Sequence, residues 1–175
     1  GRRDIPPLFA VSNFRFELDL GTLLDSPRSI PLVVLDGMQI HMPPKGERPG
    51  MGVAQQPEAE GASKAGRLVV HRILINNGRL VLLPKSADRY PLEFAVHRLQ
   101  LDEAGLGQPM KYIAMLTNPK PKGDIATEGR FGPWNAMTPS DTPLSGRYLF
   151  TKADLSVFSA IAGILHSTGT FEGNL

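Results

Sequence analysis

Apolar and polar residues alternate in segment after segment of this chain, and no other feature constrains its fold as strongly. The pattern is clearest in residues 110–117 and 143–150. The residues of one parity in these segments are Met110, Tyr112, Ala114 and Leu116, and Leu144, Gly146, Tyr148 and Phe150. A period of two puts alternate side chains on one face of an extended chain, which is typical of a half-buried β-strand. The sequence therefore predicts a mainly β fold.

Turn-forming residues divide the chain into short strands. Asp36-Gly37 interrupts the apolar stretch 30–42, and Asn76-Asn77-Gly78 interrupts the stretch 67–83. Asp-Gly and Asn-Gly between apolar runs are strong signals for a tight turn, so we expect a pair of strands in each stretch. Further strands are expected at residues 9–20, 92–101, 110–117, 124–131, 143–150 and 170–175.

Two sites are expected to interrupt regular strands. Phe9-Ala10-Val11 matches Phe94-Ala95-Val96, and the parity of the apolar residues switches after both copies, at Ser12-Asn13 and at His97-Arg98. A regular strand cannot switch parity and keep one face buried. A bulge inserts the residue that shifts the phase, so we expect a break or bulge at both sites.

A second internal repeat matches Gly37, Ile40, Met42 and Pro43 with Gly78, Val81, Leu83 and Pro84 at one fixed offset. Self-similarity of this kind favours one antiparallel sheet that is extended hairpin by hairpin. A long sheet of this kind can curl into an open trough, a β-groove, instead of closing, so we expect a curved, open sheet. Short strands at this spacing also suit a β-sandwich, which is the alternative.

One or two short helices are expected in addition to the strands, and the segment from Asp154 to Leu165 has the clearest helical signal. Thr151 and Asp154 have the spacing of a capping box. The apolar residues that follow at helical spacing are Leu155, Phe158, Ile161 and Leu165. We expect this helix to pack its apolar face on the sheet and to cap one end of it.

The composition along the chain predicts a single β-rich domain over residues 9–175. Residues 1–8 are basic and then rich in proline, and we interpret them as a flexible lead-in. Residues 45–66 are rich in Gly, Pro, Ala, Gln and Glu, and have almost no large apolar residues. Such a stretch buries too little surface to offset its ordering entropy, so we expect a mobile linker or insertion. An interdomain boundary is the alternative.

Composition also excludes several classes of function. The chain has no cysteine, which excludes disulfides, thiolate metal sites and a cysteine nucleophile. Its formal charge is only +2, and its basic residues are scattered, whereas a nucleic-acid binder more often shows a basic stripe with interleaved aromatics. The longest apolar run, residues 158–165, is far shorter than the roughly 18 residues that a membrane span needs.

No motif for catalysis is visible. The four histidines, His41, His71, His97 and His166, stand on separate expected elements and form no HExxH pair. The glycine-containing stretches match neither the G-x-S-x-G elbow nor the phosphate-binding loops. The acidic residues Asp88, Glu93, Asp102, Glu103 and Asp124 are dispersed. We therefore expect no enzyme activity, no metal and no cofactor.

The C-terminal segment TPLSGRYLFTKADLSVFSAIAGILHSTGTFEGNL, residues 142–175, resembles the recurring unit of AsmA-like proteins of the bacterial envelope. The segment MKYIAMLTNPKPKGDIATEGRFGPW, residues 110–134, and NNGRLVLLP, residues 76–84, are similar to further parts of that family. The likeness covers roughly residues 9–175 apart from the linker. Members are usually much longer and have an N-terminal membrane anchor, so we expect this chain to be the C-terminal part of a family unit.

The resemblance implies a non-catalytic segment of a periplasmic protein that is tethered to the inner membrane. Proteins of this kind resemble the repeating β-groove proteins, which carry acyl chains along a trough, so the expected role is lipid transport or outer-membrane maintenance. The implied partners are phospholipid or another acyl-chain lipid, together with inner- and outer-membrane proteins. The residues expected to line the apolar lane are Ile40, Met42, Val81, Leu83, Leu99, Leu101, Tyr112, Leu116 and Tyr148.

Other interpretations stay open at this point. The apolar lane is the ordinary core in one of them, covered by the helix and loops, because every half-buried sheet shows apolar alternation. A structural or protein-binding β-domain is the main alternative function. A carbohydrate-binding module or a small enzyme is a further alternative.

Overall fold

The computed structural model describes residues 9–17, 29–44, 69–86, 88–104, 108–135, 138 and 141–174. The expected lead-in at 1–8 and the expected linker at 45–66 lie outside this part of the chain. The described strands are β1 (Phe9–Ala10), β2 (Asn13–Glu17), β3 (Ser29–Asp36), β4 (Gln39–Met42), β5 (Val69–Leu82), β6 (Leu92–Ala104), β7 (Met110–Pro119), β8 (Lys122–Phe131), β9 (Pro143–Asp154) and β10 (Ile164–Asn174).

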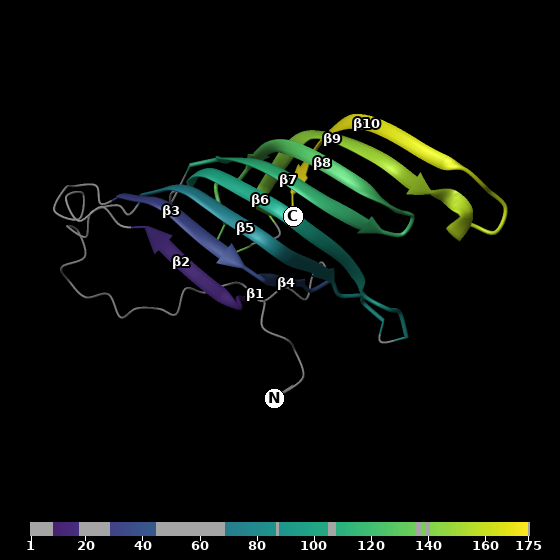
Figure 1. Cartoon of the computed structure of the whole chain (residues 1–175), viewed down its shortest axis with the longest axis horizontal. Helices are drawn as coiled ribbons and strands as arrows, with labels where there is room; N and C mark the ends of the chain where they lie inside the picture. Colours follow the sequence, from purple (N-terminus) through teal and green to yellow (C-terminus); the bar gives the residue numbers. More distant parts are fainter. Residues whose placement is uncertain are drawn as a thin grey trace.

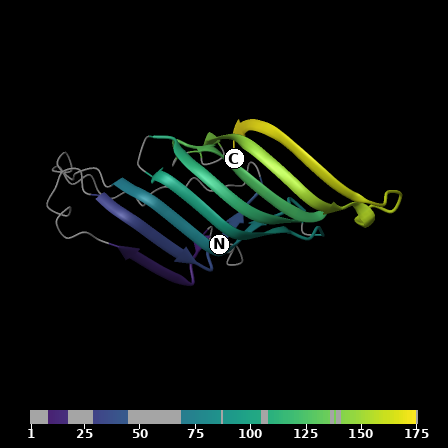
Figure 2. The same ribbon diagram turned by 45° about the horizontal axis from the view of Figure 1, so that its top comes forward.

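All ten strands belong to one sheet, which is mostly antiparallel and is not closed into a barrel. The order is β1-β4-β5-β6-β7-β8-β9-β10, and β3 joins the same edge by pairing with both β2 and β5. From β5 to β10 each strand pairs with its successor along the chain, and Figure 1 shows these strands side by side in a single curved layer. Figure 2 shows the same layer from a second direction. The prediction of an open, mainly β sheet extended by hairpins is confirmed.

The two predicted hairpins near the N-terminus are wrong. β3 and β4 do not pair with each other, and both run parallel to β5. The Asp36-Gly37 dipeptide bends one continuing chain, with Gly37 at φ 68°. β5 likewise runs through Asn77, at φ 51°, without reversing. Both turn signals therefore make kinks in parallel neighbours rather than hairpin ends.

Hydrogen bonds lock these two kinks against each other. The Gly37 amide donates to the Asn76 carbonyl at 3.0 Å, and the Arg79 amide donates to the Met38 carbonyl at 2.8 Å. The Asn77 side-chain amide also donates to the Asp36 carboxylate at 2.9 Å. Because the backbone and side-chain groups of these two turn sequences form hydrogen bonds with each other across parallel strands, neither sequence forms a hairpin turn.

Both predicted interruptions of strand alternation are confirmed, with different geometries. β1 ends at Ala10 and β2 begins at Asn13, so the chain leaves β4 and joins β3 across Ser12. In β6 the pairing with β7 shifts between Val96 and Arg98, so His97 is a bulge. The kinks at Gly37 and Asn77 lie between these two sites in the strand order, and a line of irregular residues therefore crosses the sheet.

The predicted helix from Asp154 to Leu165 is wrong. Only Leu155–Val157 form a single 3₁₀ turn, and β10 already starts at Ile164. β10 therefore begins six residues before the strand that was expected at 170–175. A helix of this length depends on tertiary packing of its apolar face, and Phe158 and Ile161 are 42% and 54% exposed.

The sheet has little enclosed core. Among the described residues the buried apolar side chains are Ile75, Val81, Val96, Tyr112, Ala114 and Ala153. Most other apolar residues of the sheet are only half-buried, because no second layer of described structure packs on them. One continuous sheet also excludes the alternative of a two-sheet sandwich for the described strands.

Candidate functional site

The strand register sorts the side chains of the sheet onto two faces. Residues directly opposite each other on neighbouring strands point to the same side. Tyr112 of β7 pairs with Leu101 of β6 and with Gly129 of β8, and Leu101 pairs in turn with Ile73 of β5. We call the side that carries Tyr112 the apolar face and the opposite side the polar face.

Rows of apolar side chains cross several strands on the apolar face. One row runs through Val96, Leu116, Ile125 and Phe150, on β6, β7, β8 and β9. A second row runs through Leu35, Ile75, Leu99 and Ala114, on β3, β5, β6 and β7. No charged side chain lies on the apolar face of β7, β8 and β9 within the paired residues 110–118, 123–131 and 144–150. The apolar character is therefore continuous across strands as well as along them.

Tyrosines lie over glycines in the C-terminal half of this face. A methyl group on Gly146 would meet the Tyr112 hydroxyl at 2.5 Å, and one on Gly169 would meet the Tyr148 ring at 3.1 Å. Only glycine leaves room for a ring that lies across the neighbouring strand. The pattern glycine-x-aromatic recurs on this face in β8, β9 and β10, as Gly129-x-Phe131, Gly146-x-Tyr148 and Gly169-x-Phe171.

The tyrosine hydroxyls are paired within the face. The Tyr112 hydroxyl lies 3.2 Å from the Thr127 hydroxyl, and the Tyr148 hydroxyl lies 3.3 Å from the Ser167 hydroxyl. The Thr127 hydroxyl donates in turn to the Arg147 carbonyl at 2.9 Å. Burial raises the pKa of the Tyr112 phenol above its ordinary value and outweighs the hydrogen bond with Thr127. These polar groups satisfy one another and leave the surface of the face apolar.

The structure brings together seven of the nine residues predicted to line a lane. The residues that share the apolar face are Ile40, Met42, Leu99, Leu101, Tyr112, Leu116 and Tyr148. Val81 pairs with His41 and Glu93 on the polar face, where it is only 6% exposed. Leu83 lies past the end of β5, and its amide donates to the Met42 carbonyl at 2.9 Å.

The displacement of Val81 has a simple cause. The repeat matches Ile40 with Val81, whereas the strand register pairs Ile40 with Leu80. A slip of one residue moves every side chain of a strand to the other face. Conversely, the sequence prediction omitted Ile125 and Phe150, which belong to the first apolar row. Phe150 was detectable, because it has the same parity as Tyr148 in one strand.

The polar face carries cross-strand ion pairs. Arg72 and Asp102 are 2.7 Å apart, Lys111 and Glu103 are 3.7 Å apart, and Arg147 pairs with Glu128. Burial alone would raise the pKa of Asp102, but the hydrogen bonds from Arg72 and Gln100 outweigh it and lower this pKa below the ordinary value.

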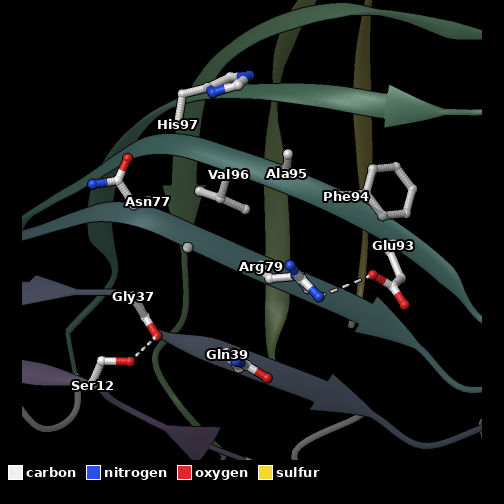
Figure 3. A pocket seen from close by; sticks show the side chains of 11 residues that line it. Ser12, Gly37, Gln39, Asn77, Arg79, Glu93, Phe94, Ala95, Val96 and His97 are labelled. Carbon is white, nitrogen blue, oxygen red and sulfur yellow. Dashed lines mark hydrogen bonds and ion pairs between the residues drawn. The ribbon is translucent and has the colours of Figure 1, made fainter.

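Two shallow depressions indent the polar face. The first, of about 450 Å³, follows the line of kinks, and Figure 3 shows Asn77, Arg79, Glu93 and His97 around it. Arg79 and Glu93 pair there at 3.4 Å, and the His97 Nε2 atom lies 2.8 Å from the Thr117 hydroxyl. Charged side chains that already pair with each other provide no set of groups converging on a ligand.

Residues that could carry chemistry stay apart in the described structure. His41, His71, His97 and His166 lie on β4, β5, β6 and β10, respectively. Within the described ranges, no three His, Cys, Asp or Glu residues are grouped so that they could hold a metal ion. The described part of the chain likewise contains no helix long and apolar enough to cross a membrane.

No protein-family model, curated protein or solved structure matches this chain. The resemblance to AsmA-like proteins therefore stays a prediction from the sequence motifs.

Proposed function

We propose that the apolar face binds the acyl chains of a phospholipid or a similar lipid. In this proposal the chain is a non-catalytic segment of a periplasmic, inner-membrane-tethered AsmA-like protein that works in lipid transport or outer-membrane maintenance. One observation carries the proposal: apolar side chains line one face of an open sheet from strand to strand, and no described layer covers them.

The dimensions of the face suit an acyl chain. From β3 to β10 the sheet crosses six steps between neighbouring strands, and at about 4.8 Å a step this spans about 29 Å. One leaflet of a bilayer is about 15 Å deep, half of a hydrocarbon core of about 30 Å. A row across the sheet is therefore long enough to hold an extended acyl chain.

The chemistry of the face also suits this cargo. An acyl chain has no polar groups along its length, so it needs no directional contact, and burial stabilises it by about 0.8 kcal/mol per methylene. Tyr112 and Tyr148 satisfy their hydroxyls internally, which avoids unpaired polar groups under bound hydrocarbon. Such binding requires neither a metal nor a catalytic group.

A structural or protein-binding β-domain is the second candidate, and one observation favours it. Among the described strands, β10 pairs with β9 alone, so one side of an eleven-residue strand presents free backbone groups. Edge strands of this kind accept a strand from a partner. In that case the apolar face would pack against the partner chain instead of a lipid.

Two consecutive residues of β7 provide the test. Leu116 is on the apolar face, and Met115 is on the polar face, where it is 54% exposed. We expect the wild-type chain and Met115→Asp to bind a fluorescent fatty-acid probe that unlabelled phospholipid displaces. Leu116→Asp should lose this binding while circular dichroism shows the sheet intact. Equal binding by the two variants, or no binding by the folded wild-type chain, would reject the lipid lane.

A further inference from the structure

The tip of the β9–β10 hairpin exposes a cluster of large apolar side chains. Their exposed fractions are 41% for Val157, 42% for Phe158, 54% for Ile161, 59% for Ile164 and 41% for Leu165. The whole segment from residue 155 to 165 contains no charged residue. Scattered exposed apolar residues are ordinary, but a contiguous group of them marks an interaction site.

Backbone hydrogen bonds give this tip a defined shape. The Leu155 amide donates to the Gly163 carbonyl at 2.9 Å and closes the base of the tip. The Phe158 amide donates to the Leu155 carbonyl, and the Ile161 amide to the Phe158 carbonyl, both at 3.0 Å. Asp154 caps the first turn by accepting from the Ser156 amide at 2.9 Å. The backbone groups are thus used internally, while the apolar side chains face outward.

The tip stands at an end of the sheet where three lysines lie together with two acidic residues, Asp124 and Asp154. β7 ends and β8 begins at this end, so Lys120 lies in the neighbouring turn, Lys122 is the first residue of β8, and Lys152 lies near the end of β9. Figure 1 shows the β9–β10 tip reaching beyond the β7–β8 turn. The Lys152 side chain is 76% exposed and lies 3.3 Å from Asp124. The outermost surface at this end is therefore apolar, with Lys120 and Lys122 behind it, while the Lys152 ammonium pairs with Asp124.

We propose that this tip inserts into the surface of a bilayer that contains anionic phospholipid. Exposed apolar side chains without charge are stabilised in the acyl region beneath the headgroups, and lysines set back from them attract anionic headgroups. The tip offers apolar area but no charged side chain for directional recognition, which favours a bilayer over a protein surface. The inference does not depend on the acyl lane, because docking at the tip requires nothing of the apolar face.

Vesicle co-sedimentation of the full chain tests this inference. The probes are vesicles of phosphatidylcholine alone and of phosphatidylcholine mixed with phosphatidylglycerol. We expect the wild-type chain to bind the mixed vesicles more strongly, and added salt to weaken this binding by screening the lysines. The affinity of the double variant Phe158→Asp, Ile161→Asp for the mixed vesicles should fall by at least about tenfold. Met115→Asp is the matched control, because Met115 and Ile161 are both 54% exposed, and it should bind like the wild-type chain.

Fluorescence provides a second readout that does not rely on introduced charges. Phe158→Trp in a Trp134→Phe background should shift its emission to the blue on mixed vesicles. The double tip variant should keep its affinity for the fatty-acid probe, whereas Leu116→Asp should keep its binding to vesicles. The two variants therefore distinguish a failure of bilayer insertion by the tip from a failure of lipid binding on the apolar face. The inference is overturned if the folded wild-type chain ignores mixed vesicles or if the double tip variant binds them normally. It is also overturned if the tip substitutions abolish self-association of the chain in solution, which would make a second copy the partner.

Discussion

Gly146 offers the sharpest test of how tyrosines and glycines pack on the apolar face. In Gly146→Ala, the added Cβ would lie 2.5 Å from the Glu128 carbonyl oxygen and 2.5 Å from the Tyr112 hydroxyl. Carbon and oxygen cannot approach so closely, so the strand or the tyrosine must move. Overpacking of this kind costs about 1–3 kcal/mol, and the lower chain entropy of alanine in the unfolded state offsets about 0.4–1 kcal/mol of that cost. We therefore expect the free energy of unfolding to fall by about 1–2 kcal/mol.

Urea denaturation followed by circular dichroism measures this change. Gly173→Ala is the matched control, because Gly173 occupies the same face in β10 and a Cβ there meets nothing within 4 Å. The control should be neutral or slightly stabilising. Tyr112→Phe removes one of the two clashing atoms, so part of the loss should return in the double variant. A Gly146→Ala variant as stable as the wild-type chain, or equal destabilisation of both alanine variants, would show that Tyr112 does not pack closely over Gly146.

Three further predictions concern the two faces and the tip. Phe150→Ala should lower the free energy of unfolding by about 1.5–2.5 kcal/mol, roughly half the value for a fully buried ring. Phe158→Ala at the exposed tip should lower it by less than about 1 kcal/mol. Equal losses of stability in urea denaturation would contradict this difference. Asp102→Asn should cost about 0.2–1 kcal/mol at neutral pH. The pKa of Asp102 is lowered in the folded state. Its contribution to the free energy of unfolding is therefore present above the unfolded pKa and is lost as pH falls through the folded pKa. A stability difference between the wild-type chain and Asp102→Asn that stays constant down to pH 2 would argue against the ion pair. Burial raises the pKa of Tyr112 in the folded state, so the contribution of this phenol to the free energy of unfolding is present below its unfolded pKa and is lost as pH rises through its folded pKa. In a spectrophotometric titration, Tyr112→Phe should remove a phenol that ionises above the ordinary pKa of tyrosine.

The sequence was sufficient to predict the fold class because alternation is a local signal with a direct physical meaning. The parity of residues 110–117 correctly grouped Tyr112, Ala114 and Leu116 on one face. The parity switch at His97 likewise predicted a bulge, because keeping one face apolar through that point requires an extra residue.

The failures arise where a local signal depends on a distant partner. Asp36-Gly37 and Asn77-Gly78 have the composition of hairpin turns. The two segments instead form hydrogen bonds with each other between parallel strands, although they are about forty positions apart in the sequence. Val81 was misplaced for the same reason, since the strand register differs by one residue from the repeat. Sequence periodicity alone does not reveal which strand will be the neighbour.

The helix prediction failed because apolar spacing does not reveal whether a packing surface exists. Leu155, Phe158, Ile161 and Leu165 fit a helical stripe, but the segment lies at a hairpin tip beyond the sheet, where no described layer could cover it. Phe158, Ile161 and Leu165 then become part of the exposed apolar group that we propose enters the bilayer. The sequence therefore contained the signal for an apolar surface and was silent about its partner.

Photo-crosslinking along β7 can determine which face of the sheet binds lipid. A photoreactive amino acid is placed in turn at positions 112 to 117, the chain is loaded with phospholipid, and the lipid attached at each position is measured by mass spectrometry. We expect attachment at Tyr112, Ala114 and Leu116, which are on the apolar face. We expect little at Ile113, Met115 and Thr117, although Ile113 and Met115 are more exposed than Tyr112 and Ala114. Attachment that follows exposure rather than parity, or none at the three apolar positions, would contradict a lipid lane on this sheet.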